Sequence, residues 1–212
     1  MELELRRERP EDHREVENLT REAFWDVHVS GCVEHYLARV MREHPDFAPE
    51  LDYVAVADGK IVGSIMYAKA WLDAEDGESL PILSFGPLSV LPEYQRRGVG
   101  SRLVEATVRM AREGGCPAIV ILGNPGNYVK HGFKNCKKHR VAMAPGKYPT
   151  CMLVLELQRG TLGKKDYLYR GSPVYEVDEA EARAFDSGFP PKESRYRPSQ
   201  EEFDMLCRSF VD

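Results

Sequence analysis

A polar, glycine-bearing loop between an apolar strand and an amphipathic helix constrains this chain more than any other feature. The apolar run ends at Leu88-Ser89-Val90, and the loop reads Gln95-Arg96-Arg97-Gly98-Val99-Gly100-Ser101. Glycines that open a helix let backbone N–H groups turn toward an anion, and the first helical turn adds unpaired donors and the positive end of the helix dipole. Two consecutive arginines would add direct charge for phosphates. The loop therefore predicts a phosphate site, although a tight strand-to-helix turn without a ligand would use the same residues.

Other phosphate-binding motifs fit this loop less well. A P-loop requires Gly-x-x-x-x-Gly-Lys-Ser/Thr, and both the lysine and the spacing are missing. A dinucleotide fingerprint requires a third glycine, but Leu103 occupies that position. Neither nucleotide motif is therefore supported.

The hydrophobic pattern around the loop predicts a mixed α/β domain. Asp58-Gly59 joins two strand-like runs and is a strong hairpin signal. Gly86-Pro87 interrupts a third strand, and because proline cannot donate to a sheet ladder, a bulge or a parting of two strands is expected there. The predicted order is a strand near 3–5, helices from 10 and from about 30, strands at 53–57, 61–71 and 80–90, a helix from 99, a strand at 118–122, a short helix at 125–130 and a strand at 151–157. This order excludes a pure helix bundle or β-sandwich.

The composition changes beyond Arg159, which predicts a domain over residues 1–159 and a C-terminal extension over 160–212 that packs on the core. Strand character is expected for 167–177, and Ser199 is expected to cap a last helix through Phe210. The extension would cover an acceptor site, mediate a homodimer or extend the sheet, and sheet extension is favoured.

Charge and cysteine content narrow the function classes. The net charge of −5 argues against a general nucleic-acid binder and favours a small-molecule partner. The five cysteines include no Cys-x-x-Cys pair, so neither a metal site nor a disulfide framework is predicted. No signal peptide and no apolar run of about 20 residues is visible, so a cytoplasmic protein without a membrane partner is expected.

The loop resembles the Gln/Arg-x-x-Gly-x-Gly/Ala motif of the GCN5-related N-acetyltransferases, the GNAT superfamily. The resemblance implies this family's fold, a central and mostly antiparallel sheet that splays between two strands, with helices on both faces. It also implies acetyl-CoA as the acyl donor. The residues that would bind its diphosphate are Gln95, Arg96, Arg97, Gly98, Val99, Gly100 and Ser101. Leu88 and Val90 would offer main-chain groups to the pantetheine arm.

A second segment, residues 122–133, resembles the other half of the family pattern, in which a tyrosine lies four residues before Gly-Phe. Tyr128 has that spacing, and the Gly-x-Pro turn before it is similar to that of a subgroup of small predicted acetyltransferases. Asn124 would either bond the pantetheine or cap a helix. A phenol titrates near 10 and a thiol near 8.5, so Tyr128 would hydrogen-bond the departing sulfur and shuttle a proton. The alternative is a tyrosine that only packs over the coenzyme groove.

The general base is not evident from the sequence. Many relatives have a glutamate where this chain has Ser84, which cannot serve as a base unaided. Water or another residue would then take the proton. Candidates are Glu34, His35 and the acids of 73–78, although a histidine at the surface is the more usual reading. Phe24 and Trp25 would wall an acceptor pocket or pack in the core, and Cys32 as an acyl-carrying nucleophile is disfavoured.

These observations together predict an enzyme that transfers an acetyl or acyl group from acetyl-CoA to a primary amine by direct attack. The acceptor would be a small molecule or a peptide. The choice between them stays open, because a fold does not specify a substrate. Two alternatives stay open: a non-catalytic acyl-CoA-binding sensor, suggested by Ser84, and an interaction domain that has lost the ligand.

Overall fold

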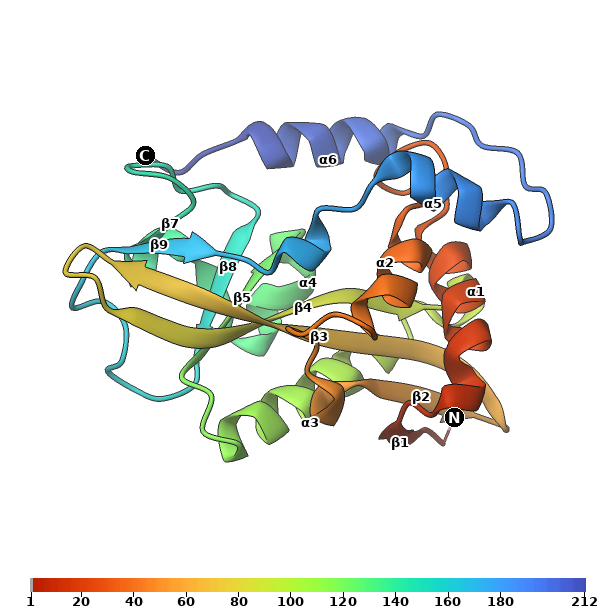
Figure 1. Cartoon of the computed structure of the whole chain (residues 1–212), viewed down its shortest axis with the longest axis horizontal. Helices are drawn as coiled ribbons and strands as arrows, with labels where there is room; N and C mark the ends of the chain where they lie inside the picture. Colours follow the sequence, from red (N-terminus) through yellow and green to blue (C-terminus); the bar gives the residue numbers. More distant parts are fainter. Residues whose placement is uncertain (1) are drawn as a thin grey trace.

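The computed structural model describes residues 2–212, and a mixed sheet forms its centre (Figure 1). In the described residues the sheet has nine strands in the order β1-β2-β3-β4-β5-β8-β6, with β9 paired to β3 and β7 paired to β9. The strands are β1 (Glu4–Arg7), β2 (Tyr53–Ala57), β3 (Lys60–Ala74), β4 (Ser79–Val90), β5 (Ala118–Leu122), β6 (Lys134–Asn135), β7 (Val141–Ala142), β8 (Met152–Glu156) and β9 (Tyr167–Arg170). Most pairings are antiparallel; β4–β5 and β7–β9 are parallel.

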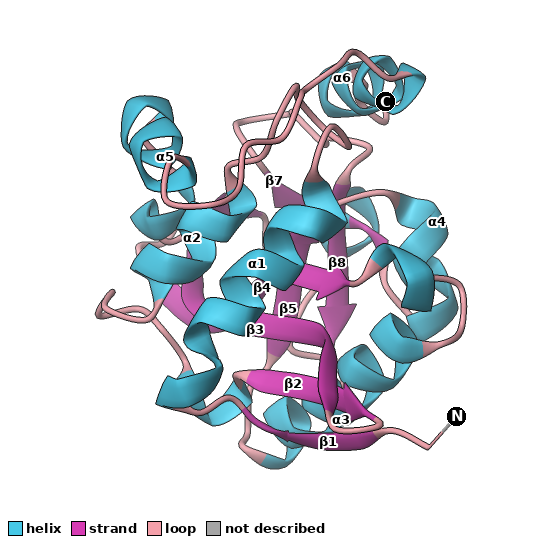
Figure 2. Ribbon diagram, turned by 90° about the vertical axis from the view of Figure 1, so that its right-hand side faces the viewer, coloured by secondary structure: helices cyan, strands magenta, loops and turns pink. Residues whose placement is uncertain are grey.

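Helices cover both faces of this sheet. The α-helices are α1 (His13–Phe24), α2 (Glu34–Met41), α3 (Val99–Glu113), α4 (Pro125–Tyr128), α5 (Glu179–Asp186) and α6 (Pro198–Arg208). Seen from the end of the molecule, α2 and α5 lie on the left and α3 and α4 on the right (Figure 2). The predicted fold class is therefore confirmed. None of the helices within residues 2–212 is long and apolar enough to cross a membrane.

Along β3 and β4, alternate residues contact the helices on opposite faces of the sheet. Gly63 of β3 lets α3 approach closely, because a Cβ there would lie 2.9 Å from Val99 Cγ1. On the same face, the buried hydroxyls of Tyr67 and Thr107 lie 2.9 Å apart and share a hydrogen bond. On the opposite face, Ser89 Oγ donates to Thr20 Oγ1 of α1 at 3.0 Å. Successive strand residues point to opposite faces, so β4 contacts both layers.

The β4 strand is irregular where the sequence predicts a break. Phe85 pairs with Tyr67 and Leu88 pairs with Ile65, so Gly86 and Pro87 together oppose a single β3 residue. The predicted bulge is confirmed, and the Gly86–Pro87 peptide bond is cis. The β4–β5 ladder has one register pair, Leu83 with Ile119, and beyond it β4 continues to Val90 paired with β3 but not with β5. The sheet therefore splays between β4 and β5 beyond Leu83.

Several element predictions need correction. Strand structure in 167–177 is limited to β9, because Pro173 begins a 3-10 turn, η6 (Pro173–Tyr175). The α5 helix was not predicted, and neither were the two-residue strands β6 and β7. Ser199 lies inside α6, whose N-cap is Arg197, and the helix ends at Arg208 rather than near Phe210. The second helix begins at Glu34 rather than near 30, after Gly31 in a left-handed conformation (φ +82°).

The C-terminal segment packs on the α1–α2 side of the sheet. β9 lies along Trp71–Ala74 of β3, so the segment does extend the sheet. The Arg21 guanidinium of α1 binds the Asp186 carboxylate of α5, with Nε 2.5 Å from Oδ1. Beyond α6, the Thr150 N–H donates to the Ser209 carbonyl at 2.9 Å. The segment is thus attached at several separate points.

Candidate functional site

The loop between β4 and α3 leaves the first helical amides without a capping side chain. Gly98 is the N-cap in a left-handed conformation (φ +86°), which suits glycine, and it has no side chain that could bond to the first turn. Arg102 N–H is the first amide with an intrahelical acceptor, the Gly98 carbonyl at 3.0 Å. The amides of Val99, Gly100 and Ser101 therefore remain donors at the positive end of the α3 dipole. Such a helix start is an anion site.

The side chains of the loop point outward around this helix start. Gln95, Arg96, Arg97 and Gly98 are exposed, while Gly100 and Ser101 are half-buried. Arg96 adopts a left-handed conformation (φ +60°), unusual for a residue with a Cβ. The Arg97 guanidinium lies 5.7 Å from the ring centroid of Tyr94. Two positive side chains thus accompany the free amides, which raises the positive potential of the loop.

The main-chain groups of Leu88 and Val90 face away from β3. Leu91 N–H donates to the Val62 carbonyl at 3.0 Å, and main-chain groups alternate in direction along an antiparallel strand. Leu88 and Val90 therefore direct their N–H and C=O groups into the gap that opens between β4 and β5. The Gln95 side chain already donates to the Val90 carbonyl at 3.1 Å, so Gln95 braces the loop against the strand.

Tyr128 lies in an aromatic cluster on the α3 face of that gap. Its ring centroid is 5.7 Å from that of Phe85 and 5.9 Å from that of Phe133. A Cβ on Gly123 would come within 2.9 Å of Tyr128 Cε2, so the glycine allows the ring to pack against the turn. Burial raises the pKa of the Tyr128 phenol to about 12. The phenol is therefore fully protonated at neutral pH and available as a hydrogen-bond donor.

Asn124 caps a helix, one of the two roles expected for it. Its Oδ1 accepts a hydrogen bond from Gly126 N–H at 2.9 Å, at the start of α4. This contact holds the turn that carries Tyr128.

The two general-base candidates on α2 are buried or already have partners. His35 has no exposed surface and packs against the ring of Phe185 in α5 and that of Phe189 just beyond it. Its Nε2 lies 3.1 Å from Asp186 Oδ1, but the angle does not make a hydrogen bond, and burial lowers the pKa of the ring. Glu34 is occupied by His28 and by the Cys32 thiol.

The remaining candidates have structural contacts of their own. In the hairpin turn, Asp73 pairs with Arg170, and Lys165 pairs with two acids of the 73–78 group. Trp25 is buried and donates its indole N–H to the Glu193 carbonyl at 3.0 Å, which matches the core-packing alternative. Burial raises the pKa of the Cys32 thiol well above its ordinary value, so Cys32 is a poor nucleophile.

The sequence reasoning missed two tyrosines that the fold brings to Ser84. Ser84 is buried on β4, opposite Ala68 of β3. Tyr169 and Tyr175 of the C-terminal segment lie close to the Ser84 hydroxyl. Burial raises the pKa of both phenols, and the nearby Ser84 hydroxyl offsets part of that rise. Within residues 2–212, neither phenol makes a hydrogen bond of usual geometry to the Ser84 hydroxyl, and the Tyr175 hydroxyl is buried without a partner. The density of tyrosines in 167–175 was visible in the sequence, but their contact with β4 was not.

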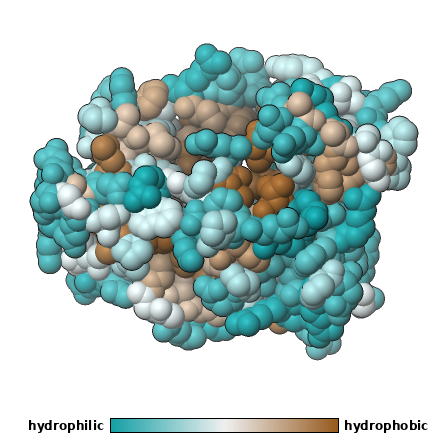
Figure 3. Space-filling model, viewed as in Figure 1, coloured by the Kyte–Doolittle hydropathy of each residue, from teal (hydrophilic) through white to brown (hydrophobic). Residues whose placement is uncertain are grey.

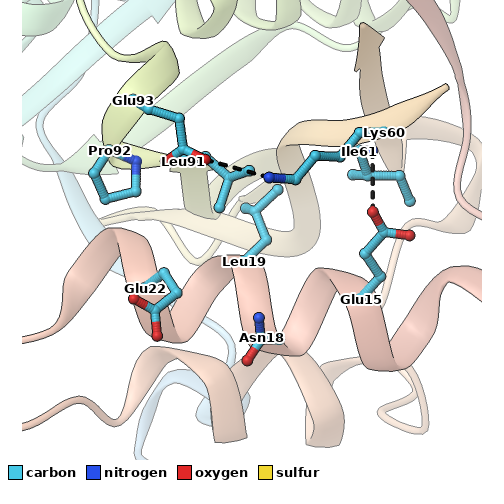
Figure 4. A pocket seen from close by; sticks show the side chains of 9 residues that line it. All are labelled: Glu15, Asn18, Leu19, Glu22, Lys60, Ile61, Leu91, Pro92 and Glu93. Atoms are coloured by element: carbon cyan, nitrogen blue, oxygen red, sulfur yellow. Dashed lines mark hydrogen bonds and ion pairs between the residues drawn. The ribbon is translucent and has the colours of Figure 1, made fainter. Parts of the chain in front are cut away.

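Two clefts lie outside the β4–β5 gap. One of about 400 Å³ lies between α1 and the strand ends, and its carboxylates are Glu15, Glu22 and Glu93, with Lys60 paired to Glu93 at 3.2 Å (Figure 4). This acidic lining would repel a diphosphate. The other, of about 290 Å³, runs along α3 and includes Arg109 and Lys130. Within residues 2–212, no three His, Cys, Asp or Glu side chains gather as a metal site.

The comparisons with known proteins point in one direction. The model of the acetyltransferase (GNAT) family matches residues 15–133. The chain is 36% identical over 114 residues to the uncharacterized N-acetyltransferase YjhQ of Escherichia coli (strain K12), an alignment that covers 53% of this chain and 61% of YjhQ. The chain thus spans less than two thirds of that relative. The uncharacterized N-acetyltransferase YhbS of the same strain is 29% identical over 136 residues, covering 64% of this chain and 75% of YhbS.

Two solved structures share the fold over most of their length. The crystal structure of the GNAT family N-acetyltransferase YhbS from Escherichia coli in complex with CoA has a TM-score of 0.71 at 25% identity, covering 82% of this chain and 92% of that one. A GNAT family acetyltransferase from Brucella melitensis in complex with acetyl-CoA has a TM-score of 0.63 at 25% identity, covering 82% of this chain and 98% of that one.

Proposed function

Because this chain belongs to the acetyltransferase (GNAT) family, we propose that it transfers an acetyl group from acetyl-CoA to a primary amine of a small molecule or a peptide. The observation that carries the proposal is the combination of uncapped amides at the start of α3 with outward-facing main-chain groups of Leu88 and Val90. The first suits a diphosphate, and the second suits the amide groups of a pantetheine arm. Related structures that contain CoA or acetyl-CoA support this assignment.

The loop residues divide the binding of the donor between main chain and side chains. Val99, Gly100 and Ser101 would donate amides, while Arg96 and Arg97 would contribute positive charge. Gln95 would hold the loop to Val90, and Gly98 would permit the turn. Asn124 would act indirectly, by holding the turn that positions Tyr128.

The reaction would proceed by direct attack of a neutral amine on the thioester carbonyl. A C–N bond forms, the carbonyl becomes a tetrahedral oxyanion, and its collapse breaks the C–S bond to release the thiolate of CoA. A backbone N–H that faces the gap, most directly that of Leu88, would stabilise the oxyanion. The attacking nitrogen loses its extra proton to water, because Ser84 cannot act as a base unaided.

Tyr128 would stabilise the departing sulfur. A phenol with a pKa of about 12 does not give up its proton completely to a thiolate whose conjugate acid titrates near 8.5. It does donate a hydrogen bond, and that bond strengthens as negative charge develops on the sulfur. Solvent then protonates the thiolate after CoA leaves. The contribution of Tyr128 is therefore electrostatic, and it is largest in the transition state.

A second candidate function is a non-catalytic acyl-CoA-binding sensor. It is favoured by Ser84, which cannot act as a base unaided and stands where the family resemblance implies a glutamate. A sensor would bind acetyl-CoA but would not release CoA with any amine.

One experiment separates these two functions. The purified chain is incubated with acetyl-CoA and a panel of amino acids, polyamines, aminoglycosides, aryl amines and peptides, and free thiol is measured. Binding is followed in parallel by the shift of the melting temperature with acetyl-CoA. Thiol release that depends on one amine class supports the enzyme; binding without release supports the sensor; the absence of both refutes the proposed function.

A further inference from the structure

Three hydroxyls gather at the β4 break on the face opposite Tyr128. Ser84 precedes the bulge, and the ring of Tyr175 covers the bulge itself, with Cε1 only 3.8 Å from where a Gly86 Cβ would lie. Tyr169 is placed by β9, whose register sets it beside Leu72 of β3. Its hydroxyl folds back to 3.1 Å from the Cβ position of Gly171. Two phenols from the C-terminal segment thus meet a serine on the central strand.

The two faces of the break carry different groups. Phe85 points to the α3 face, where Tyr128 contacts it, and the next residue, Gly86, faces the opposite layer, where Tyr175 lies. The uncapped amides of α3 are on the Tyr128 side. If acetyl-CoA is held by those amides and directed into the gap, the Ser84–Tyr175 side remains free for the amine substrate.

We infer that Tyr175, Tyr169 and Ser84 form the acceptor side of the site and hold the attacking amine by accepting its N–H hydrogen bonds. The inference deepens the proposed acetyl transfer and rests on it. The strongest observation is the Tyr175 hydroxyl, which is buried and has no hydrogen-bond partner in the described residues. A buried polar group without a partner costs free energy unless a ligand or water satisfies it.

The chemistry of these hydroxyls suits a neutral amine. Burial keeps both phenols protonated, because it raises their pKa values above the ordinary one. A protonated hydroxyl still has oxygen lone pairs, so it accepts from N–H while the nitrogen lone pair points at the thioester. Such contacts orient the nucleophile without acting as a base.

The surroundings indicate the type of acceptor. Apolar side chains surround Tyr175, among them Met66, Val174 and Phe47 of one core cluster. Tyr169 packs against a second cluster, which includes Ala70 and Leu72. The face drawn in Figure 3 has an apolar hollow below α6, the helix that crosses the top of the same view in Figure 1. An apolar, hydroxyl-lined site desolvates an ammonium ion, which favours acceptors whose amine is attached to an apolar group over polycations.

The test compares Tyr175→Phe and Tyr169→Phe with Tyr196→Phe, a matched control in the same segment whose residue is 66% exposed. KM for the amine, KM for acetyl-CoA, kcat and melting temperature are measured with the best amine from the panel. Loss of one neutral hydrogen bond predicts a rise of about threefold to tenfold in the amine KM, or an equivalent loss of kcat/KM. The KM for acetyl-CoA and the melting temperature should stay unchanged, and the control should behave as wild type.

Two results would overturn the inference. In an active wild-type background, unchanged amine kinetics in both variants would exclude the phenols from the acceptor side while leaving acetyl transfer intact. An equal rise in the KM for acetyl-CoA would place them on the donor instead. A wild-type chain that binds acetyl-CoA but acetylates no amine would overturn the proposed function, and this inference with it.

Discussion

Replacing Tyr128 by phenylalanine separates catalysis from packing. The ring contacts Phe85, Phe133 and Gly123, and phenylalanine preserves all three contacts. What is lost is one hydroxyl, whose pKa is raised by burial alone. Since no intramolecular hydrogen bond is forfeited, the free energy of unfolding should stay within about 0.5 kcal/mol of wild type.

The expected effect on turnover is much larger. Removing one preorganised donor from a developing anion costs about 100-fold to 1000-fold in kcat, because the bond is strongest in the transition state. Acetyl-CoA binding should change little, since the contacts proposed for its diphosphate and pantetheine arm come from the α3 loop and β4. Because the pKa of Tyr128 is about 12, the wild-type rate should not fall through loss of this proton below about pH 10.

Tyr67→Phe supplies the matched control. The Tyr67 hydroxyl shares a buried hydrogen bond with Thr107 at 2.9 Å, so its removal should cost about 1 kcal/mol of stability. For a chain of this length that lowers the melting temperature by about 2 to 4 °C, while turnover should remain near wild type.

The assay combines single-turnover thiol release with thermal denaturation on both variants. Tyr128→Phe should lose turnover and keep its stability, whereas Tyr67→Phe should lose stability and keep its turnover. Equal single-turnover rates for wild type and Tyr128→Phe would refute the role of the phenol. A large loss of stability in Tyr128→Phe would refute the packing argument.

Three further predictions concern the scaffold. Gly63→Ala places a Cβ 2.9 Å from Val99 Cγ1, so it should cost about 1 to 3 kcal/mol and weaken acetyl-CoA binding in calorimetry, whereas Gly100→Ala, with 3.6 Å to its nearest neighbour, should leave stability unchanged. Burial lowers the pKa of His35 below 6.5, so the unfolded chain binds more protons; stability should fall as pH drops below 6.5, and His35→Gln should flatten that dependence in denaturant titrations. Burial, and then Glu8, raise the pKa of Asp52, so the folded state loses stability relative to the unfolded chain as pH rises above 3.8. Asp52→Asn should therefore raise the free energy of unfolding by about 1 kcal/mol or more at pH 7 and by little at pH 4. An equal rise at both pH values would contradict this.

The sequence by itself determined features whose physical cause is local. Asp58-Gly59 joins β2 to β3 because both residues adopt left-handed conformations there, with φ of +50° and +78°. Gly98 opens α3 for the same reason. Pro87 predicts the irregularity in β4 because its ring removes a ladder donor. Each of these depends on one or two residues and their backbone, so the pattern alone was sufficient.

Only the tertiary structure decided what depends on contacts between distant segments. An isolated histidine has an ordinary pKa, yet Phe185 of α5 and Phe189 beyond it pack on the His35 ring, which has no exposed surface. The sequence was compatible with Asn124 as a ligand-binding residue or as a helix cap, and the hydrogen bond from Gly126 N–H shows that it is a cap. Tyr169 and Tyr175 reach Ser84 because β9 pairs with β3, and no local pattern encodes which strand a short segment will join. Burial and proximity are properties of the whole fold, which is why the sequence alone indicated the loop proposed to bind the donor but not the groups proposed to face the acceptor.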